Sequence, residues 1–242
     1  YSLICPTLSF FIVSIILLYQ SFSNYFLKFG EVMKNYSLII WDFNGTLLDD
    51  VGAALGSVND MLARRGKNPI SLDEYREYID VPIRHFYEQV LDLENEDYET
   101  ILVEFQQGYE AHVKSSGLTR FVPEALEEAR RLGIPQVVLS SSEQSQLERL
   151  LKKYGIDGYF DSVLGADNLL AGSKVERAEK FIETHGVDAS KAVVIGDLLH
   201  DCDVAKAIGS QCLLITSGHH DRERLEQACV RVEDTLESFV KE

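Results

Sequence analysis

Residues 38–48, which read LIIWDFNGTLL, decide the fold class of this chain. An apolar run suited to a short buried strand ends on the carboxylate of Asp42, and a tight Asn-Gly turn follows. Open parallel sheets bind ligands at the carboxyl ends of their strands, so Asp42 is the first candidate for chemistry. An Asn-Gly pair between apolar residues is equally typical of a plain β-hairpin, and this segment alone does not separate the two structures.

The sequence after Pro123 alternates helical segments with short apolar runs. The expected helices cover 124–132, 143–154, 175–184 and 204–208, and the expected strands cover 136–140, 162–165, 192–196 and 212–216. This alternation is the pattern of βαβ units that share a parallel sheet. It therefore favours a sheet strand, and not a hairpin, for the residues before Asp42.

A helical block separates the first strand from this region. Val51, Leu55, Val58 and Leu62 recur at helical spacing, and the pattern stays helical without strand-like alternation over 68–116. We therefore expect an α/β fold with a Rossmann-like parallel sheet core, formed by residues 33–48 and 119–242. Residues 49–118 are expected to form an all-helical cap inserted after the first strand.

Residues 1–32 form an apolar N-terminal extension whose composition differs from the rest of the chain. Its densest apolar part, residues 10–19, is short for a membrane span, which needs about 20 residues. A signal peptide opens with Met and a basic region, whereas this chain opens with Tyr1. We favour a true start at Met33, with residues 1–32 as upstream read-through, over a membrane anchor; membrane association is expected only if the segment is a real anchor.

The composition excludes some partners. The chain has 242 residues, 45% of them apolar, and a formal net charge of −16. Nucleic-acid binding needs clustered Lys and Arg, so no nucleic-acid partner is expected. The four cysteines are scattered without a Cys-x-x-Cys pair, which suggests neither a zinc site nor a disulfide framework. A reducing, cytoplasmic compartment is the expected location.

Side chains that can carry chemistry follow several of the expected strands. In chain order they are Asp42, Ser140-Ser141-Ser142, Lys174, Asp197 and Asp201. The carboxyl ends of parallel strands share one edge, so three carboxylates, hydroxyls and an ammonium group are expected to converge there. Each of these residues also has an ordinary interpretation when taken singly. Lys174 would be a solvated lysine at a helix start, and Asp197 and Asp201 would be a helix N-cap and a first-turn acid.

Four motifs occur in a fixed order along the chain. They are Asp42-x-Asn44-Gly45-Thr46-Leu47, the apolar strand ending at Ser140, the lone Lys174, and Gly196-Asp197-x-x-x-Asp201. In this order they resemble the haloacid dehalogenase-like hydrolase superfamily, and within it the phosphoglycolate phosphatase-like group with a helical cap. The resemblance covers residues 36–240, and the expected cap lies where this family inserts one.

The resemblance implies a Mg²⁺-dependent phosphatase that hydrolyses a small phosphorylated, phosphoglycolate-like metabolite through an aspartyl-phosphate intermediate. Asp42 would attack phosphorus. The metal would be held by the carboxylates of Asp42 and Asp197 and by the backbone carbonyl of Asn44, and Asp201 would bind it or fix one of its waters. Oxygen ligands of this kind suit Mg²⁺, which would separate the carboxylate nucleophile from a phosphate dianion.

The same resemblance implies the substrate contacts. Lys174 would neutralise the charge that grows on the phosphoryl oxygens, and the hydroxyl of Ser140 would bind one of them. The sequence does not separate Ser140 cleanly from Ser141, although the spacing to the next helix favours Ser140. The other expected substrate contacts are Ser141, Gly45, Thr46 and, in the cap, Arg84. An ordinary surface arginine is the alternative for Arg84.

Asn44 departs from the family pattern, because most phosphatases of this superfamily carry an aspartate there that protonates the leaving group and then activates water. An amide cannot exchange that proton, and loss of a general acid typically reduces the rate by about 10²- to 10⁴-fold. A slow enzyme, a good leaving group and a substitute acid are therefore all open. His200, His219 and His220 are within conceivable reach, but for each a loop histidine on a polar rim is the favoured interpretation.

Two functions from different classes follow. The first is the Mg²⁺-dependent phosphatase, and the second is a weakly active or non-catalytic phosphate-binding or regulatory protein that has lost turnover through Asn44. Turnover of p-nitrophenyl phosphate, which needs little protonation of its leaving group, separates them.

Overall fold

A six-stranded parallel sheet forms the centre of the computed structural model, with strand order β5-β4-β1-β6-β7-β8. The strands are β1 (Leu38–Trp41), β4 (Gln136–Glu143), β5 (Ser162–Ala166), β6 (Ala192–Gly196), β7 (Gln211–Ile215) and β8 (Arg231–Glu233). The structure describes residues 33, 36–167, 173–228 and 230–239. The predicted N-terminal extension lies outside the described residues. Within these ranges, no helix combines the length and the apolar character that a membrane crossing requires.

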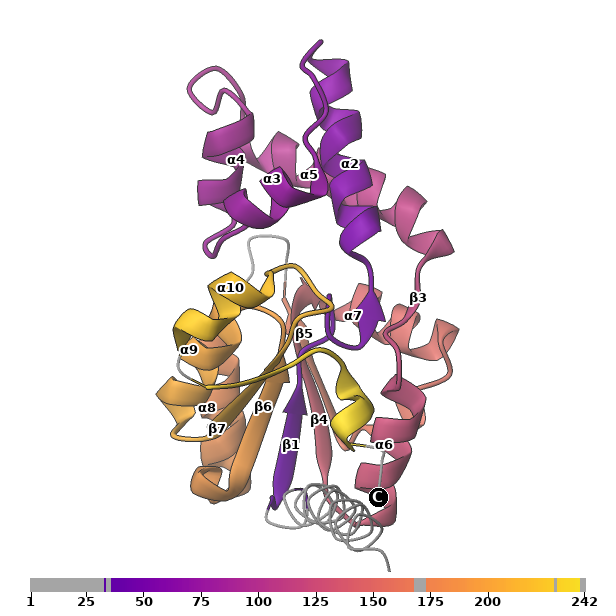
Figure 1. Cartoon of the computed structure of the whole chain (residues 1–242), viewed down its shortest axis with the longest axis vertical. Coiled ribbons are helices and arrows are strands. Elements are labelled where there is room, and N and C mark those ends of the chain that lie inside the picture. Colours follow the sequence, from indigo (N-terminus) through magenta and orange to yellow (C-terminus); the bar gives the residue numbers. More distant parts are fainter. Residues whose placement is uncertain (1–32, 34–35, 168–172, 229, 240–242) are drawn as a thin grey trace, which may run out of the picture.

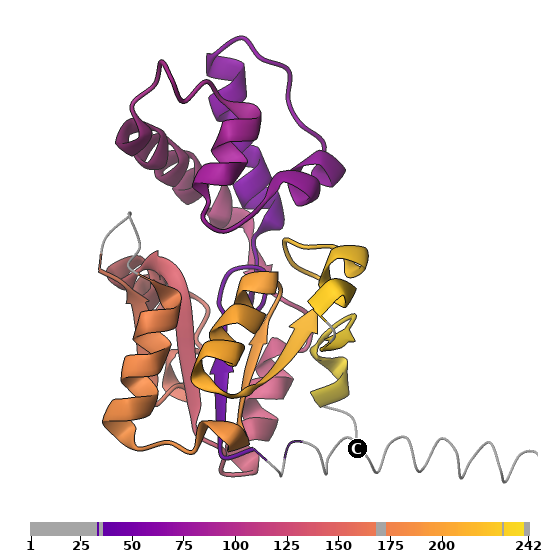
Figure 2. The same cartoon turned by 90° about the vertical axis from the view of Figure 1, so that its left-hand side faces the viewer.

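Four helices cover the two faces of the sheet (Figures 1 and 2). They are α6 (Val122–Arg131), α7 (Gln144–Lys153), α8 (Lys174–His185) and α9 (Leu199–Ile208). The side chains of β1 alternate between the faces, as a pleated strand requires. Leu38 and Ile40 belong to the apolar cluster that α8 and α9 share, whereas Ile39 and Trp41 belong to the one that includes α6 and α7. Burial on both faces explains why β1 is apolar without alternation in its sequence.

The predicted parallel sheet is confirmed, and its register sets the position of the site. Trp41, the last residue of β1, is aligned with Val138 of β4 and Ile195 of β6. The backbone N–H of Asp42 donates to the carbonyl of Ile195 at 2.8 Å. The residues that follow β1 and β6 therefore leave the sheet side by side.

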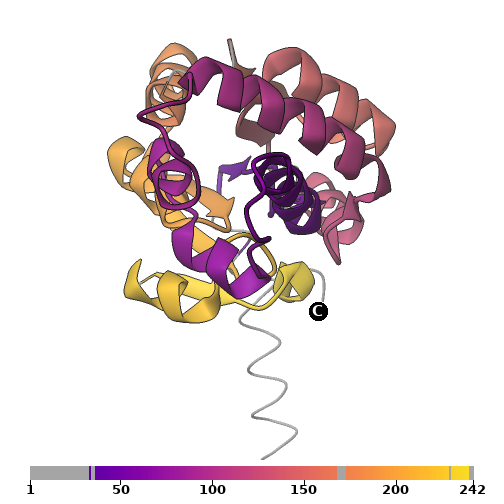
Figure 3. The same cartoon turned by 90° about the horizontal axis from the view of Figure 1, so that it is seen from above.

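The block between β1 and α6 is helical in the structure. It contains α2 (Val51–Arg64), α3 (Leu72–Tyr78), α4 (Arg84–Val90), α5 (Tyr98–His112) and the 3₁₀ turn η1 (Val113–Ser115). Seen from above, these helices lie over the carboxyl ends of the strands (Figure 3). A short antiparallel pair, β2 (Leu48–Asp49) with β3 (Gly117–Leu118), forms where the chain leaves and re-enters the sheet region. The division into a core and a cap with the predicted boundaries stays a prediction.

Some elements were not predicted. They are β2, β3, the edge strand β8, the short helix α10 (Arg222–Leu225) and the 3₁₀ turns η2 (Asp157–Tyr159), η3 (Ala189–Lys191), η4 (Glu226–Ala228) and η5 (Leu236–Phe239). Strand β4 also runs three residues beyond its predicted end at Ser140, with a register shift between Leu139 and Glu143. That irregularity lies within the serine run and changes the direction of successive side chains.

Two of the cysteines meet in the fold despite their separation in sequence. Cys202 of α9 and Cys212 of β7 are both free thiols, and their Sγ atoms lie 2.8 Å apart. This contact was not predicted, because it depends on the packing of α9 against β7.

Candidate active site at the carboxyl edge of the sheet

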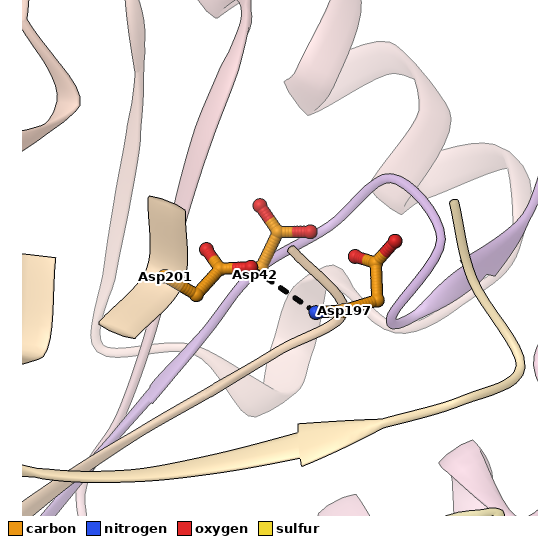
Figure 4. A group of neighbouring side chains, drawn as sticks. All are labelled: Asp42, Asp197 and Asp201. Atoms are coloured by element: carbon orange, nitrogen blue, oxygen red, sulfur yellow. Dashed lines mark hydrogen bonds between the residues drawn. The ribbon is translucent and has the colours of Figure 1, made fainter. Parts of the chain in front are cut away.

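Three buried carboxylates meet at the carboxyl ends of β1 and β6. Asp42 follows β1, Asp197 follows β6, and Asp201 lies in the first turn of α9. One oxygen of each lies within 4.8 Å of the others, and the three side chains approach from different elements (Figure 4). The structure thus brings together the three acids that the strand-end argument selected.

Lys174, the first residue of α8, joins this cluster. Its Nζ donates to Asp42 Oδ1 at 2.5 Å and to Asp201 Oδ1 at 2.6 Å, and the residue is only 6% exposed. A solvated lysine at a helix start is therefore the wrong description. The ammonium group instead lies between the proposed nucleophile and a proposed metal ligand.

Backbone and hydroxyl donors fix the other two carboxylates. Thr46 Oγ1 donates to Asp197 Oδ1 at 2.9 Å, and the N–H of His219 donates to Asp197 Oδ2 at 2.7 Å. Asp201 Oδ2 accepts from the N–H groups of Asp197 and Leu198 at 3.1 and 3.0 Å. Asp201 is thus the first-turn acid of α9 as well as a member of the cluster, whereas the N-cap residue of this helix is Leu198 and not Asp197.

Gly45 makes this close packing possible. Its φ is +77°, in the left-handed region, and a Cβ at this position would lie 2.2 Å from Asp197 Oδ2. A side chain here would both strain the turn and displace the carboxylate. The glycine of the Asn-Gly turn is therefore required by the site as well as by the backbone.

The charges of the cluster favour a bound cation. Burial, followed by the charges of Asp201 and Asp197, raises the pKa of Asp42 well above its ordinary value, although Lys174 opposes this. Burial also raises the pKa of Asp197 to about 6. The carboxylates raise the pKa of Lys174 although burial lowers it, so the ammonium stays charged. With all groups ionised the cluster carries two negative charges, and its buried oxygen donors fit a hard divalent ion such as Mg²⁺.

The Asn44 side chain contacts groups on both sides of its amide. Its Oδ1 accepts from the hydroxyls of Ser140 at 3.2 Å and Ser142 at 2.8 Å. Its Nδ2 donates to Asp50 Oδ2 at 2.7 Å and to the Tyr109 hydroxyl at 2.8 Å. Sequence reasoning missed Asp50 and Tyr109, since neither stands in one of the four motifs, and it named Ser142 only as part of the serine run.

The serine run divides in the structure. Ser140 is fully buried, and its hydroxyl oxygen also accepts from the Ser142 N–H at 3.0 Å, whereas Ser141 is exposed. The structure therefore places Ser140 and Ser142, and not Ser141, beside Asn44. Involvement of Ser141 with the substrate stays a prediction.

Arg84 is not brought into the cluster. It begins α4, its side chain is 51% exposed, and its Nε lies 3.0 Å from Glu88 Oε1. The guanidinium also stacks over the Tyr98 ring at 5.1 Å from the centroid. These contacts match the surface arginine that was the alternative in the sequence, and a contact with substrate stays a prediction.

Two of the three histidines are not on a polar rim, so that interpretation is wrong for them. His219 and His220 are 7% and 2% exposed. His220 accepts from the Leu199 N–H at 3.3 Å and contacts the Ile79 carbonyl at 3.2 Å, and burial lowers its pKa to about 4. It is therefore a neutral link between α9 and the end of α3. His200 is partly exposed beside Asp203, as a rim histidine would be.

His219 connects the sheet edge to helix α3. Its Nδ1 lies 2.9 Å from the Tyr75 hydroxyl of α3, and its Nε2 lies 3.4 Å from Asp50 Oδ1. Burial lowers its pKa, but the hydrogen bond and charge of Asp50, with the charges of Asp197 and Asp42, raise it to about 9. The imidazole is therefore a buried cation at neutral pH.

Metal-free protein is expected to lose stability as the pH rises from 6.5 to about 9, because His219 has its raised pKa only in the folded state. The protonated His219 stabilises the fold fully at pH values below the pKa of histidine in the unfolded chain. This stabilisation is lost as the pH rises through the pKa of His219 in the folded protein, and for this shift it amounts to about 3 kcal/mol in the free energy of unfolding. Urea unfolding in EDTA at pH 6.5 and 9 measures the change. His219→Gln removes the titrating group and should flatten the pH dependence; an equally steep loss in that variant would contradict the assignment.

Comparison with known proteins places this site in a family context. The family model described as "Haloacid dehalogenase-like hydrolase" matches residues 39–215. Phosphoglycolate phosphatase 1 of Pseudomonas aeruginosa is 27% identical over 215 residues, covering 84% of this chain and 78% of the relative. Phosphoglycolate phosphatase of Neisseria gonorrhoeae is 27% identical over 208 residues, covering 82% of this chain and 87% of the relative.

Solved structures share the fold. A protein described as a predicted phosphatase from Clostridium acetobutylicum superposes with a TM-score of 0.69 at 20% identity, over 84% of this chain and 95% of that one. A predicted phosphoglycolate phosphatase from Haemophilus somnus gives a TM-score of 0.68 at 18% identity, over 83% and 95% of the two chains. At these identities the likeness shows the α/β fold, which agrees with the class predicted from the sequence.

Proposed function

The chain belongs to the haloacid dehalogenase-like hydrolase family and is a phosphoric monoester hydrolase, and from this premise we propose that it hydrolyses a small phosphorylated, phosphoglycolate-like metabolite with the help of Mg²⁺. The observation that supports this most directly is the buried group of Asp42, Asp197, Asp201 and Lys174 at one edge of the sheet. A cytoplasmic location stays a prediction.

In the proposed reaction, an Asp42 carboxylate oxygen forms a bond to phosphorus and the bond to the leaving oxygen breaks. Water then attacks the aspartyl phosphate, which releases inorganic phosphate and restores the carboxylate. Lys174 is already within hydrogen-bond distance of Asp42, so its charge is in place to stabilise the phosphoryl oxygens without reorganisation.

The carboxylates of Asp42, Asp197 and Asp201, with the backbone carbonyl of Asn44, would hold the metal. When bound, Mg²⁺ would supply the positive charge that lets a carboxylate approach a phosphate dianion. Thr46 and the N–H of His219 hold Asp197 in place by hydrogen bonds to both of its oxygens. Ser140 and Ser142 contact the Asn44 side chain, so their proposed role is to shape the substrate side of the site.

Removal of the metal tests this function. We expect the purified chain to hydrolyse p-nitrophenyl phosphate in Mg²⁺, to lose turnover in EDTA, and to regain it when Mg²⁺ is added back. Phosphoglycolate hydrolysis, followed as phosphate release, should show the same dependence. Turnover that is unaffected by chelation would contradict the proposed role of the carboxylates as metal ligands.

Asn44 supports a second candidate, a phosphate-binding or regulatory protein with little turnover. An amide cannot supply the proton that a poor leaving group needs. Binding of phosphate or phosphoglycolate by calorimetry, without turnover of p-nitrophenyl phosphate, would favour this function over the phosphatase.

A further inference from the structure

A fourth buried carboxylate, Asp50, lies just before α2 and outside the metal-site cluster. It is 1% exposed, yet it stands in none of the motifs that point to the proposed function. Its Oδ1 accepts from the Gly45 N–H at 2.7 Å, and its Oδ2 accepts from Asn44 Nδ2 at 2.7 Å and from the Tyr109 hydroxyl at 2.6 Å. His219 Nε2 lies 3.4 Å from Oδ1. Asp50 occupies the N-cap position of α2, but its side chain makes no hydrogen bond to the helix and instead forms the centre of this polar group.

These contacts fix the orientation of the Asn44 amide. An ionised carboxylate only accepts hydrogen bonds, so the side of Asn44 that faces Asp50 must be its NH₂ group. The opposite side then presents the carbonyl oxygen to the hydroxyls of Ser140 and Ser142, both of which can donate. Every partner agrees with one orientation, and the flipped amide would place its oxygen against a carboxylate.

The same geometry bears on the residue type at position 44. An aspartate in the place of Asn44 would set a carboxylate oxygen about where Nδ2 lies now, 2.7 Å from Asp50 Oδ2. Two buried carboxylates at that distance cannot both ionise without a large electrostatic cost. The amide at position 44 and the acid at position 50 are therefore matched to each other.

We propose that Asn44 and Asp50 act as one unit. The buried carboxylate of Asp50 fixes the orientation of the Asn44 amide, two residues after the nucleophile Asp42. Asp50 also carries the negative charge that an aspartate at position 44 would otherwise carry. Asp50 is a positioning residue, since it acts on the site through Asn44 and Gly45. The proposal rests on the proposed phosphatase function and extends it to the substrate class. Because the unit has no proton to give at position 44, we expect phosphate esters whose leaving groups depart as stable anions, as in aryl or acyl phosphates, to react faster than phosphoglycolate, whose leaving group is an alkoxide.

Reaction with such a substrate balances without an acid at position 44. The Asp42 oxygen forms its bond to phosphorus while the bond from phosphorus to the leaving oxygen breaks, and the electron pair stays on that oxygen. The leaving group takes its proton from solvent after departure only if its acidity requires one. Rate should therefore depend steeply on the acidity of the leaving group.

A double-mutant cycle tests the unit, with Asn44→Asp, Asp50→Asn and the combined variant. Asn44→Asp alone should lower turnover of p-nitrophenyl phosphate by about 10-fold or more and lower the melting temperature in EDTA, because it pairs two carboxylates. Asp50→Asn alone should also lower turnover, since an amide cannot accept from all of the donors around Asp50. The combined variant exchanges donor and acceptor within the pair, so it should exceed both single variants in turnover and in melting temperature.

A second readout separates positioning from a purely structural role. The combined variant carries an acid at position 44, so its rate on phenyl phosphate, which has a less acidic leaving group, should rise relative to its rate on p-nitrophenyl phosphate. We expect the ratio of the two rates to change by about 10-fold or more from the native value. Asp49→Asn makes the same chemical change at the exposed neighbouring residue and should leave turnover and melting temperature unchanged.

The proposal is overturned if Asn44→Asp alone equals or exceeds the native chain in turnover and melting temperature, or if the combined variant shows only the summed effects of the single changes. Absence of turnover in the native chain with every phosphate ester would instead defeat the phosphatase function. In that case the melting temperatures of the four proteins still decide whether the two residues are coupled.

Discussion

Asp42→Asn is expected to abolish turnover of p-nitrophenyl phosphate in Mg²⁺ while the protein stays folded. The proposed reaction needs a carboxylate oxygen as nucleophile, and an amide oxygen does not replace it. Loss of a nucleophile that acts together with its partners costs on the order of 10⁴-fold or more in kcat. Steady-state assays of native and variant protein at saturating Mg²⁺ measure the change.

Stability provides the control for this variant. The pKa of Asp42 is raised by burial and by the neighbouring carboxylates, which means that its charged form is disfavoured in the metal-free fold. The asparagine keeps an oxygen that can accept from Lys174 but removes one negative charge. The melting temperature in EDTA should therefore equal or exceed the native value. Retention of more than a few per cent of native turnover by a folded variant would contradict nucleophilic attack by Asp42.

The sequence predicts the sheet well where strands are apolar on both faces. Residues buried on both sides, such as Ile39 and Ile40 in β1, form a continuous apolar run that marks a central strand. Edge strand β8 has no such mark, because Arg231–Glu233 is short and only partly buried. Strands β2 and β3 have two residues each, which is too short for any periodic pattern.

Helix α9 shows a different limit. It begins at Leu199, but the predicted helix begins only at Val204. The residues between them are mostly polar, because the first turn of this helix faces the acidic site, where Asp201 lies, and not the apolar core. Apolar periodicity therefore starts one turn late. Membership of the buried acidic cluster has replaced the apolar signal on which the helix prediction depends.

The convergence of Asp42, Asp197 and Lys174 could be predicted because parallel strands end at one edge, whatever their separation in sequence. Asp50 and Tyr109 could not, since Asp50 reads as the residue before an ordinary helix and Tyr109 lies within one. Their meeting depends on how the helices between β1 and α6 sit over the sheet edge. That placement is a tertiary property, and a single sequence carries no periodic pattern for it.

Lys174→Met is expected to destabilise metal-free protein strongly at pH 8. The change removes the ammonium that contacts Asp42 and Asp201, and leaves those two buried carboxylates without the cation that they share. Breaking a buried ion pair by removing one partner typically costs about 3–5 kcal/mol in the free energy of unfolding. Urea unfolding in EDTA at pH 8, beside native protein, measures it.

The pH dependence of this effect follows from the neighbouring acids. The pKa of Asp197 is about 6 in the folded state, above its ordinary value of 3.8, and that of Asp42 is also raised. Groups of this kind bind protons more readily when folded, so stability falls as the pH rises through the folded pKa. Without Lys174 the raised values should move higher still. The destabilisation by Lys174→Met should therefore be smaller at pH 5 than at pH 8.

Mg²⁺ separates the electrostatic role of Lys174 from its catalytic one. A divalent cation held by the three carboxylates would supply the missing charge, so Mg²⁺ should restore much of the lost stability in Lys174→Met. It should not restore turnover, because no ammonium then faces the phosphoryl oxygens. Lys180→Met changes an exposed lysine of the same helix and is the matched control, with native stability and turnover expected. Native stability of Lys174→Met at both pH values would mean that the ammonium does not balance the charge of the buried acids. It would also contradict the inference that the negative charge of these acids favours a bound cation.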